Sequence, residues 1–376
     1  MTTPLGSSPA IITETLVQST VNCDKEKVLN ISNVALNSEA VIRHSKSLDI
    51  RSHKQEWLNI DYLRSRQADE KALSKFILSN ERRIDVVSCY VCRGSDRKEF
   101  ARSYGIPYFQ CADCGHVYAS VVLPPEELAT YYRKEYFEDT VYVDDRQVDR
   151  RKYMVYEPKV RFVMDFVQNH RKQWLDVGTG NGSLLACARD LGFDGLGLEP
   201  GTLAIEFAER TFGLTLLPHP IQEELQRSGP ASYDVVSFFM VLEHVSNPRE
   251  QVSTAAELLA PGGLLVIEVP TAESMSARLD SLFTDQGLRQ LVNEHIMLYT
   301  VQSAKRLVED SGCQPEGFWF MGQDIFNLFI HLALHNPQFL HSPMAEFLLA
   351  NNDALQQIVD RNEFCDEVII VARKPS

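Results

Sequence analysis

The stretch Trp174-Leu-Asp-Val-Gly178-Thr-Gly180-Asn-Gly182-Ser183 decides the fold of this chain, because it joins an apolar run to a helical pattern through alternating glycines. Glycine has no side chain, so the backbone of such a turn can approach a bound molecule closely. A turn of this kind between a strand and a helix is typical of nucleotide-like ligand sites at the edge of a parallel sheet. The stretch therefore predicts a strand, a ligand-binding loop and a helix, in that order.

The spacing of the glycines argues against a nicotinamide dinucleotide as the ligand. The dinucleotide fingerprint requires Gly-x-Gly-x-x-Gly or Ala, and Ser183 stands at its third position. About 20 residues after the loop, Glu199 ends the next apolar run, where a carboxylate can accept hydrogen bonds from both hydroxyls of a ribose. The loop and Glu199 together indicate a ribose-containing ligand other than NAD.

From Gln173 onward, short apolar runs alternate with helical patterns. This alternation predicts an α/β fold with a doubly wound, mainly parallel sheet of seven strands covered on both faces. Residues 324–362 form a segment that is too long and too apolar for a loop, so helices are expected there before the last strand. The seven expected strands are 174–177, 195–199, 214–217, 233–239, 263–269, 317–320 and 367–372.

Residues 155–376 resemble the class I methyltransferases that use S-adenosylmethionine, a Rossmann-like family. Asp176 opens the glycine loop as an acid does in that family, the segment Tyr233–Pro248 is similar to its fourth strand and following helix, and Leu259–Gly263 resembles its turn into the fifth strand. The resemblance implies an S-adenosylmethionine cofactor, with the loop packed under its methionine part and an acid on its ribose. The cofactor-binding residues that it implies are Asp176, Gly178, Thr179, Gly180, Gly182, Glu199 and Phe239.

Four of the eight cysteines form two pairs with the spacing of a metal site. Cys89-Tyr-Val-Cys92 is followed after 18 residues by Cys111-Ala-Asp-Cys114, which matches a four-thiolate zinc pattern. Four thiolates close the coordination sphere of the ion, so a structural Zn²⁺ is expected. The alternative is that these thiols are free or redox-active. Cys23, Cys187, Cys313 and Cys365 have no such partners and are expected to pack as small apolar residues.

These features divide the chain into five parts. The expected parts are a weakly ordered arm (1–50), a helical lead-in (51–88), a small N-terminal zinc-knuckle domain (89–118), a tyrosine-rich linker or lid (119–154) and the methyltransferase-like core (155–376). In the linker, Tyr132 and Tyr136 could close over the site or form an aromatic core with the knuckle.

Together with the knuckle, the core is similar to a zinc-containing subgroup that often acts on sugar nucleotides and other small biosynthetic intermediates. In the sugar C-methyltransferases of this subgroup, a Tyr-x-Glu-His segment supplies the general base. The aligned stretch here is Val292-Asn293-Glu294-His295, which keeps Glu and His but lacks the tyrosine. The resemblance implies that His295 with Glu294 is the first candidate for the base.

His244 with Glu243 is the second candidate, because it follows the fourth strand of the core at the ligand-binding edge. For either histidine, the alternative is a structural role in a helix cap or a polar gap.

Composition limits the remaining functions. The chain has 376 residues, 44% hydrophobic residues and a formal charge of -14, which fits a globular protein rather than a disordered, coiled-coil or collagen-like one. Without an apolar run of membrane-spanning length or an export signal, we expect a cytoplasmic protein and no membrane partner. The negative charge makes nucleic acid a poor partner.

We expect a methyltransferase that acts on a small-molecule acceptor, with a homodimer left open. One alternative is methylation of an RNA or protein recruited by the knuckle, although residues 89–118 hold only 4 Lys+Arg against 3 Asp+Glu. The other alternative is a non-catalytic, zinc-stabilised binding protein.

Overall fold

The computed structural model describes residues 40–46, 48–54, 56–127, 145–168 and 172–376. Its centre is an eight-stranded sheet in which the last strand of the chain is antiparallel to both neighbours and the other pairs are parallel. In spatial order the strands are β1 (Val41–His44), β13 (Gln314–Met321), β14 (Glu367–Arg373), β11 (Leu259–Pro270), β10 (Tyr233–Phe239), β7 (Gln173–Val177), β8 (Asp194–Leu198) and β9 (Leu216–Leu217).

The expected α/β architecture is confirmed, and all seven expected strands form. The structure adds one strand to this sheet: β1 lies within residues 1–50, which were expected to be weakly ordered, and it pairs in parallel with β13. Three of its four side chains are exposed, as is common at a sheet edge. Its sequence, Val-Ile-Arg-His, is short and does not alternate apolar with polar residues, so no strand pattern marked it in the sequence.

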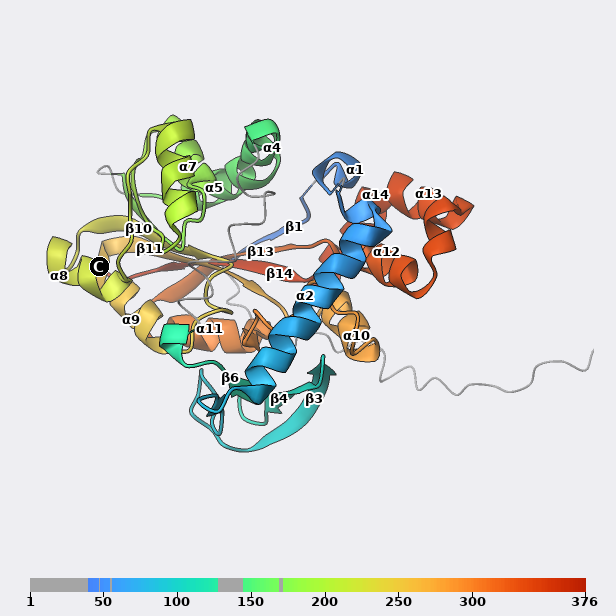
Figure 1. Ribbon diagram of the computed structural model, residues 1–376. Coiled ribbons are helices and arrows are strands. Elements are labelled where there is room, and N and C mark those ends of the chain that lie inside the picture. The colour runs from blue at the N-terminus through green and yellow to red at the C-terminus, as the bar shows by residue number, and fades with distance from the viewer. Residues whose placement is uncertain (1–39, 47, 55, 128–144, 169–171) are drawn as a thin grey trace, which may run out of the picture.

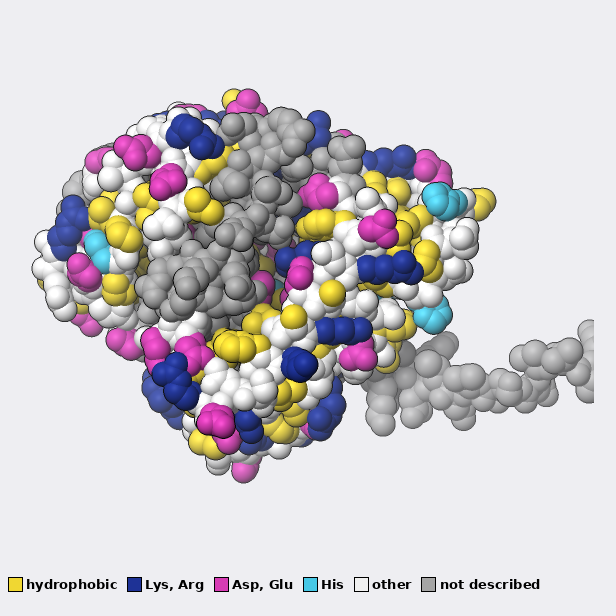
Figure 2. Space-filling view, in the orientation of Figure 1, with side chains coloured by type: hydrophobic (Ala, Val, Ile, Leu, Met, Phe, Trp, Pro, Cys, Tyr) yellow, Lys and Arg dark blue, Asp and Glu magenta, His cyan; other side chains and the backbone are white. Residues whose placement is uncertain are grey.

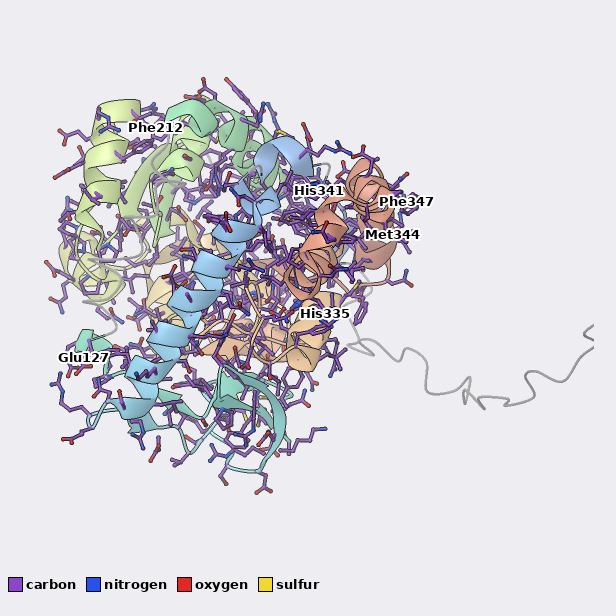
Figure 3. The ribbon with its side chains drawn as sticks, turned by 45° about the vertical axis from the view of Figure 1, so that its right-hand side comes forward. Glu127, Phe212, His335, His341, Met344 and Phe347 are labelled. Atoms are coloured by element: carbon purple, nitrogen blue, oxygen red, sulfur yellow. The ribbon has the colours of Figure 1, made fainter. Side chains whose placement is uncertain are left out.

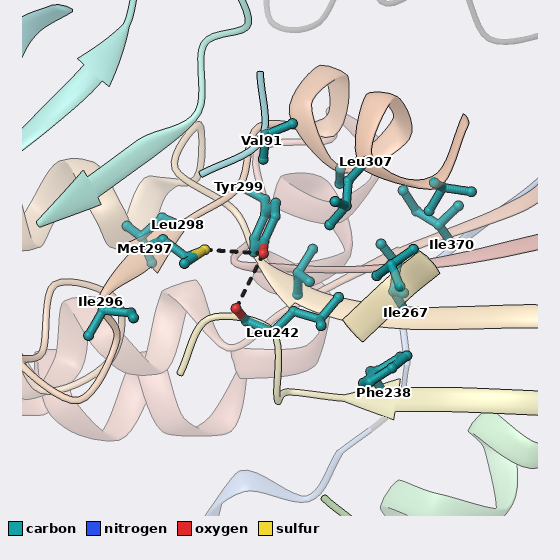
Figure 4. Close-up of a cluster of buried hydrophobic side chains, with 14 of the residues drawn as sticks. Val91, Phe238, Leu242, Ile267, Ile296, Met297, Leu298, Tyr299, Leu307 and Ile370 are labelled. Carbon is teal, nitrogen blue, oxygen red and sulfur yellow. Dashed lines mark hydrogen bonds between the residues drawn. The ribbon is translucent and has the colours of Figure 1, made fainter. Parts of the chain in front are cut away.

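Successive residues of the central strands point to opposite faces of the sheet, and helices cover both faces (Figure 1). Trp174 and Val235 join one apolar cluster, whereas Leu175 and Val236 join the other. Figure 4 shows part of the second cluster, in which the Tyr299 hydroxyl donates to the carbonyl of Leu242. The first face carries α5 (Glu157–Met164), α6 (Ser183–Asp190) and α7 (Thr202–Phe212), and the second carries α8 (Ile221–Ser228), α9 (Pro248–Leu258) and α11 (Val301–Glu309).

Helices also form in residues 324–362, as expected. A third apolar cluster joins Leu63, from the N-terminal part of the chain, to Phe326 of this insertion. On the outer side of the insertion, Met344 is 57% exposed and Phe347 53% exposed (Figure 3). The helical elements of this region are α1 (Ile50–His53), η1 (Glu56–Leu58), α2 (Ile60–Ser79), α10 (Met275–Leu282), α12 (Asp324–His335), η3 (Pro337–His341), α13 (Pro343–Ala350) and α14 (Asn352–Arg361).

The cysteine-rich part forms two small sheets, one of which includes a strand of the core. Tyr118 in the cysteine-rich part pairs with Met297 in the core, so the two parts share one sheet and one apolar cluster. Helix α2, 20 residues long, runs from the insertion to these sheets (Figure 1). The strands are β2 (Ile84–Asp85) with β6 (Val121–Val122), and β3 (Arg97–Ser103), β4 (Ile106–Cys111) and β5 (Val117–Ala119) with β12 (Met297–Leu298).

Two further helical elements, α4 (Asp145–Arg151) and the π-helical η2 (Lys152–Tyr156), precede α5. Within the described ranges, no helix is both long and apolar enough to cross a membrane.

Candidate functional site

The four paired cysteines converge beside the four-stranded small sheet, in which Cys111 ends β4. Their Sγ atoms lie within 4.8 Å of one another, with 3.5 Å between Cys89 and Cys114 and 3.4 Å between Cys92 and Cys111. Four sulfurs bound to one zinc ion at about 2.3 Å would be separated by about 3.8 Å. The backbone N–H of Gly94 also donates to Cys92 Sγ, at 3.4 Å. The donor set therefore fits a metal held by four thiolates.

The cysteine-rich part holds the loop that carries the predicted Glu294-His295 pair. The Tyr108 hydroxyl, which is buried, donates toward the carbonyls of Val292 at 3.0 Å and His295 at 2.9 Å. The backbone N–H of Ala119 donates to the carbonyl of Ile296 at 2.9 Å. The conformation of this core loop thus depends on the cysteine-rich part being folded.

Helix α2 fixes the same loop. The Glu70 carboxylate accepts from the backbone N–H of Asn293 at 2.9 Å and from its side-chain amide at 3.2 Å. Burial raises the pKa of Glu70 to about 8, and the charge of Glu294 adds to this effect. Val292 stands at the tyrosine position of the Tyr-x-Glu-His segment, and the next residue, Asn293, anchors the loop.

Removing the Tyr108 hydroxyl tests this attachment. Tyr108→Phe is expected to lower the thermal unfolding midpoint by roughly 2 °C or more, because it removes a net hydrogen bond of about 1 kcal/mol and leaves buried carbonyls unpaired. Differential scanning calorimetry measures the change. Tyr153→Phe, at a side chain that is 62% exposed, makes the same atomic change as a control. Equal midpoints for the two variants would refute the attachment.

The glycine loop connects β7 to α6, as expected. Gly178, Gly180 and Gly182 have φ values of 68°, 58° and 76°, in the left-handed region that favours glycine. A Cβ at Gly178 would lie 2.6 Å from Cγ2 of Val241, in the connection after β10. A Cβ at Gly180 would meet no described atom within 4 Å. The loop therefore packs on the β10 connection at one glycine and borders open space at the next.

Two buried carboxylates flank this loop. Asp176 accepts from the Ser237 hydroxyl at 2.6 Å, and Glu199 accepts from the backbone N–H groups of Gly180 at 2.9 Å and Gly201 at 2.8 Å. Burial raises the pKa of Asp176 to about 6 and that of Glu199 to about 7. Each carboxylate oxygen has two lone pairs, so Glu199 can also accept from ribose hydroxyls. The pair suits a ligand that carries a positive charge and a ribose.

A buried ion pair beside these carboxylates was missed in the sequence. Lys159 Nζ in α5 lies 2.6 Å from Glu268 Oε2 in β11, and the Lys159 charge acts to lower the pKa of Asp176. A signal was present, because Glu268 is the single charged residue in the apolar run of residues 263–269. Acids within buried strands are rarely tolerated without a partner or a function.

The histidines predicted as bases lie together beyond the carboxyl end of β10, with ring centroids 5.0 Å apart. His244 Nε2 is 3.7 Å from Glu243 Oε1. In the sequence analysis, His295 is paired with Glu294. In the structure, His295 Nδ1 instead lies 3.0 Å from the carbonyl of Gln290. The carbonyl of Glu294 lies 2.9 Å from Nδ1 of the other histidine, His244. Burial lowers the pKa of His295 to about 3 and that of His244 to about 4, so both rings are neutral at pH 7.

The other predicted residues border the same region. Phe239 is the last residue of β10, and its ring centroid lies 5.8 Å from Lys159 Nζ. Thr179 packs on β8, because a Cβ at Gly197 would lie 2.6 Å from its Cγ2. Tyr132 and Tyr136, which were expected to line the site or the knuckle, lie outside the described residues.

Comparison with known proteins finds matches to the central part of the chain. Residues 148–316 match a family model described as a methyltransferase domain. Two similar curated proteins are ubiquinone biosynthesis O-methyltransferases. The protein of Methylococcus capsulatus is 35% identical over 108 residues, 27% of this chain and 46% of that protein, and the protein of Caulobacter sp. is 36% identical over 98 residues, 25% and 38% respectively. The chain thus spans less than half the length of these two relatives.

The solved structures that match the chain are more distant in sequence. A SAM-dependent methyltransferase from Archaeoglobus fulgidus is 17% identical with a TM-score of 0.42, covering 61% of this chain and 100% of its own. Phosphoethanolamine N-methyltransferase 2 of Haemonchus contortus is 16% identical with a TM-score of 0.45, covering 69% and 63% respectively. The matched family region includes the glycine loop and both histidines, and the four cysteines lie outside it.

Proposed function

We propose that this protein is an S-adenosylmethionine-dependent methyltransferase that acts on a small-molecule acceptor, such as a nucleotide sugar or another biosynthetic intermediate. The observation that carries the proposal is the left-handed glycine loop between the buried carboxylates of Asp176 and Glu199. Two buried acids with raised pKa values favour a ligand that brings a positive charge, as a sulfonium does. The match of residues 148–316 to a methyltransferase domain supports the same cofactor.

In this proposal each part of the site has one task. When bound, S-adenosylmethionine supplies a methyl group that is already activated for displacement, so the protein mainly aligns the acceptor. Glu199 accepts hydrogen bonds from the ribose of the cofactor, and Asp176 lies near the positively charged part of the cofactor. An acceptor hydroxyl must also lose a proton, and we propose that this loss depends on His295 with His244 and Glu243 beside it. The simplest form of this dependence is the general-base role that the resemblance implies for His295.

The cysteine cluster is proposed to bind one structural Zn²⁺ through Cys89, Cys92, Cys111 and Cys114. Four thiolates leave no coordination position for substrate, so the ion would stabilise the knuckle and the loop attached to it.

The charge distribution supports a small-molecule acceptor over a nucleic acid. Figure 2 shows Lys and Arg side chains mixed with Asp and Glu over α2 and the cysteine-rich part, and they do not form a continuous basic stripe there.

In the sequence analysis, a homodimer is left open. We propose that the exposed Met344 and Phe347 of α13 form its contact surface.

The test of the cofactor is its affinity as a function of pH. Binding of a positive ligand favours the ionised carboxylates, whereas protons compete with the ligand below the raised pKa values of about 6 and about 7. Affinity for S-adenosylmethionine is therefore expected to rise roughly tenfold between pH 6 and pH 8. Isothermal titration calorimetry measures this rise.

Glu199→Gln provides the matched control, because it keeps the shape of the side chain and removes the titrating group. Its affinity should be lower at pH 8 and should depend less on pH. Tight binding of NAD with no heat from S-adenosylmethionine would contradict the proposal. No heat from either compound would favour the non-catalytic alternative.

A further inference from the structure

A second group of metal-ligating side chains lies in the core, separate from the cysteines. It consists of Glu243, His244 and His295, named the histidine cluster below. One ligand atom of each residue lies within 4.8 Å of the other two. His244 Nε2 is 3.7 Å from Glu243 Oε1, and the two imidazole rings meet at an interplanar angle of 65°. Small side-chain adjustments would bring these atoms to the spacing of ligands on one ion.

Both imidazoles are oriented as metal ligands usually are. The Nδ1 atom of His244 faces the carbonyl of Glu294 at 2.9 Å, and that of His295 faces the carbonyl of Gln290 at 3.0 Å. A carbonyl can only accept, so in each neutral ring the proton sits on Nδ1 and the lone pair on Nε2. A backbone carbonyl that fixes the tautomer in this way is a common partner of metal-binding histidines.

The carboxylate of Glu243 is the second observation that indicates a ligand. Its side chain is 0% exposed, and neither of its oxygens has a hydrogen-bond partner among the described residues. Burying an ionised carboxylate without a partner costs several kcal/mol, and a bound cation offsets such a cost. In the adjacent glycine-loop site, by contrast, both oxygens of Glu199 accept backbone hydrogen bonds.

We infer that the histidine cluster binds one divalent first-row transition-metal ion through the carboxylate of Glu243 and the Nε2 atoms of His244 and His295. Two imidazoles and one carboxylate suit Mn²⁺, Fe²⁺, Co²⁺ or Zn²⁺ better than Mg²⁺ or Ca²⁺, which prefer oxygen ligands alone. Three protein ligands leave coordination positions open, unlike the four cysteines.

The purpose of this ion rests on the proposed function. An acceptor hydroxyl that binds an open position on the ion has a lowered pKa, as metal-bound water does. Its O–H bond would break, the proton would pass to solvent, and the oxygen would keep the electron pair with which it attacks the methyl carbon. The bond from that carbon to sulfur would break at the same time, and the sulfur would leave with its electron pair as uncharged S-adenosylhomocysteine. His295 then acts as a ligand instead of accepting the proton itself. The inference thus narrows the acceptor to a molecule that presents a hydroxyl beside the methyl donor.

Binding of Mn²⁺ to the full-length protein tests the site. Manganese prefers nitrogen and oxygen ligands, so a zinc-loaded cysteine cluster does not compete for it. Unbound Mn²⁺ is measured by electron paramagnetic resonance while the ion is titrated into the protein. The wild type is expected to bind one Mn²⁺ per chain, and Glu243→Gln and His295→Ala should each weaken binding at least about tenfold.

The control is His219→Ala, which removes an imidazole that lies 3.4 Å from the buried carboxylate of Glu224. His219 and Glu224 belong to neither group of possible metal ligands found among the described residues. Its Mn²⁺ affinity should equal that of the wild type. Absence of Mn²⁺ binding in the wild type, or unchanged binding in both cluster variants, overturns the inference. The wild-type titration remains decisive if a variant fails to fold.

The result is separable from that of the cofactor test. Mn²⁺ binding that depends on the cluster supports the site even if calorimetry detects no S-adenosylmethionine. Cofactor binding without Mn²⁺ binding supports the proposed function and refutes the ion.

Discussion

Cys111→Ser is expected to abolish binding of the proposed Zn²⁺ and to lower the thermal unfolding midpoint by more than about 10 °C. Zinc binding to small structural sites contributes roughly 10–16 kcal/mol in isolated zinc-finger peptides, which is comparable to the whole stability of a typical domain. Cys111 ends β4 and is 2% exposed, so its loss affects both the ligand set and the strand that carries Tyr108. Metal content by mass spectrometry of the elements and calorimetric unfolding measure the two effects.

Cys313→Ser is the matched control, because it makes the same exchange at a cysteine that is 1% exposed and lies outside the cluster. It should keep the metal content of the wild type and lose much less stability. If Cys111→Ser kept its metal and its unfolding midpoint, the cysteines would not form a structural metal site.

Gly178→Ala is expected to weaken S-adenosylmethionine binding by roughly 100-fold, or about 3 kcal/mol. Two effects add at this position. The backbone has φ 68°, which costs a residue with a Cβ about 1 kcal/mol, and the new Cβ would lie 2.6 Å from Val241 Cγ2. Relief of this contact must move either the loop or the connection that leads to the histidine cluster. Isothermal titration calorimetry measures the loss of affinity.

Gly213→Ala is the control for placing an alanine at a left-handed glycine outside the loop. Gly213 has φ 62° at the C-terminal end of α7, and a Cβ there would meet no described atom within 4 Å. This variant carries the backbone cost without the contact, so its cofactor affinity should match that of the wild type. Similar affinities for both variants would mean that the loop is not packed against Val241 in the binding-competent state.

The sequence was sufficient for the features that are local in the chain. Alternation of apolar runs and helices predicted the seven strands. The glycines marked the loop after β7, and the paired cysteines marked residues whose sulfur atoms lie close together in the structure. These features depend on short-range periodicity and on residue types with few alternative roles.

The features that were missed depend on contacts between distant segments. Nothing near Val41 indicates that it pairs with Gly317, and nothing near His244 indicates that the carbonyl of Glu294 faces its Nδ1 atom. The Lys159–Glu268 pair likewise joins a helix to a strand more than 100 residues away. Such contacts follow from the packing of the whole sheet, which local patterns do not encode.

The pairing of β5 with β12 also bears on how the chain is made. Tyr118 leaves the ribosome well before Met297, its partner in the small sheet, and synthesis of the intervening segment takes roughly 10–35 s at ordinary rates. During that interval the β5 edge of the nascent chain is open to other strands. Metal uptake by the cysteines early in translation would keep this half-built sheet compact until the last strand arrives.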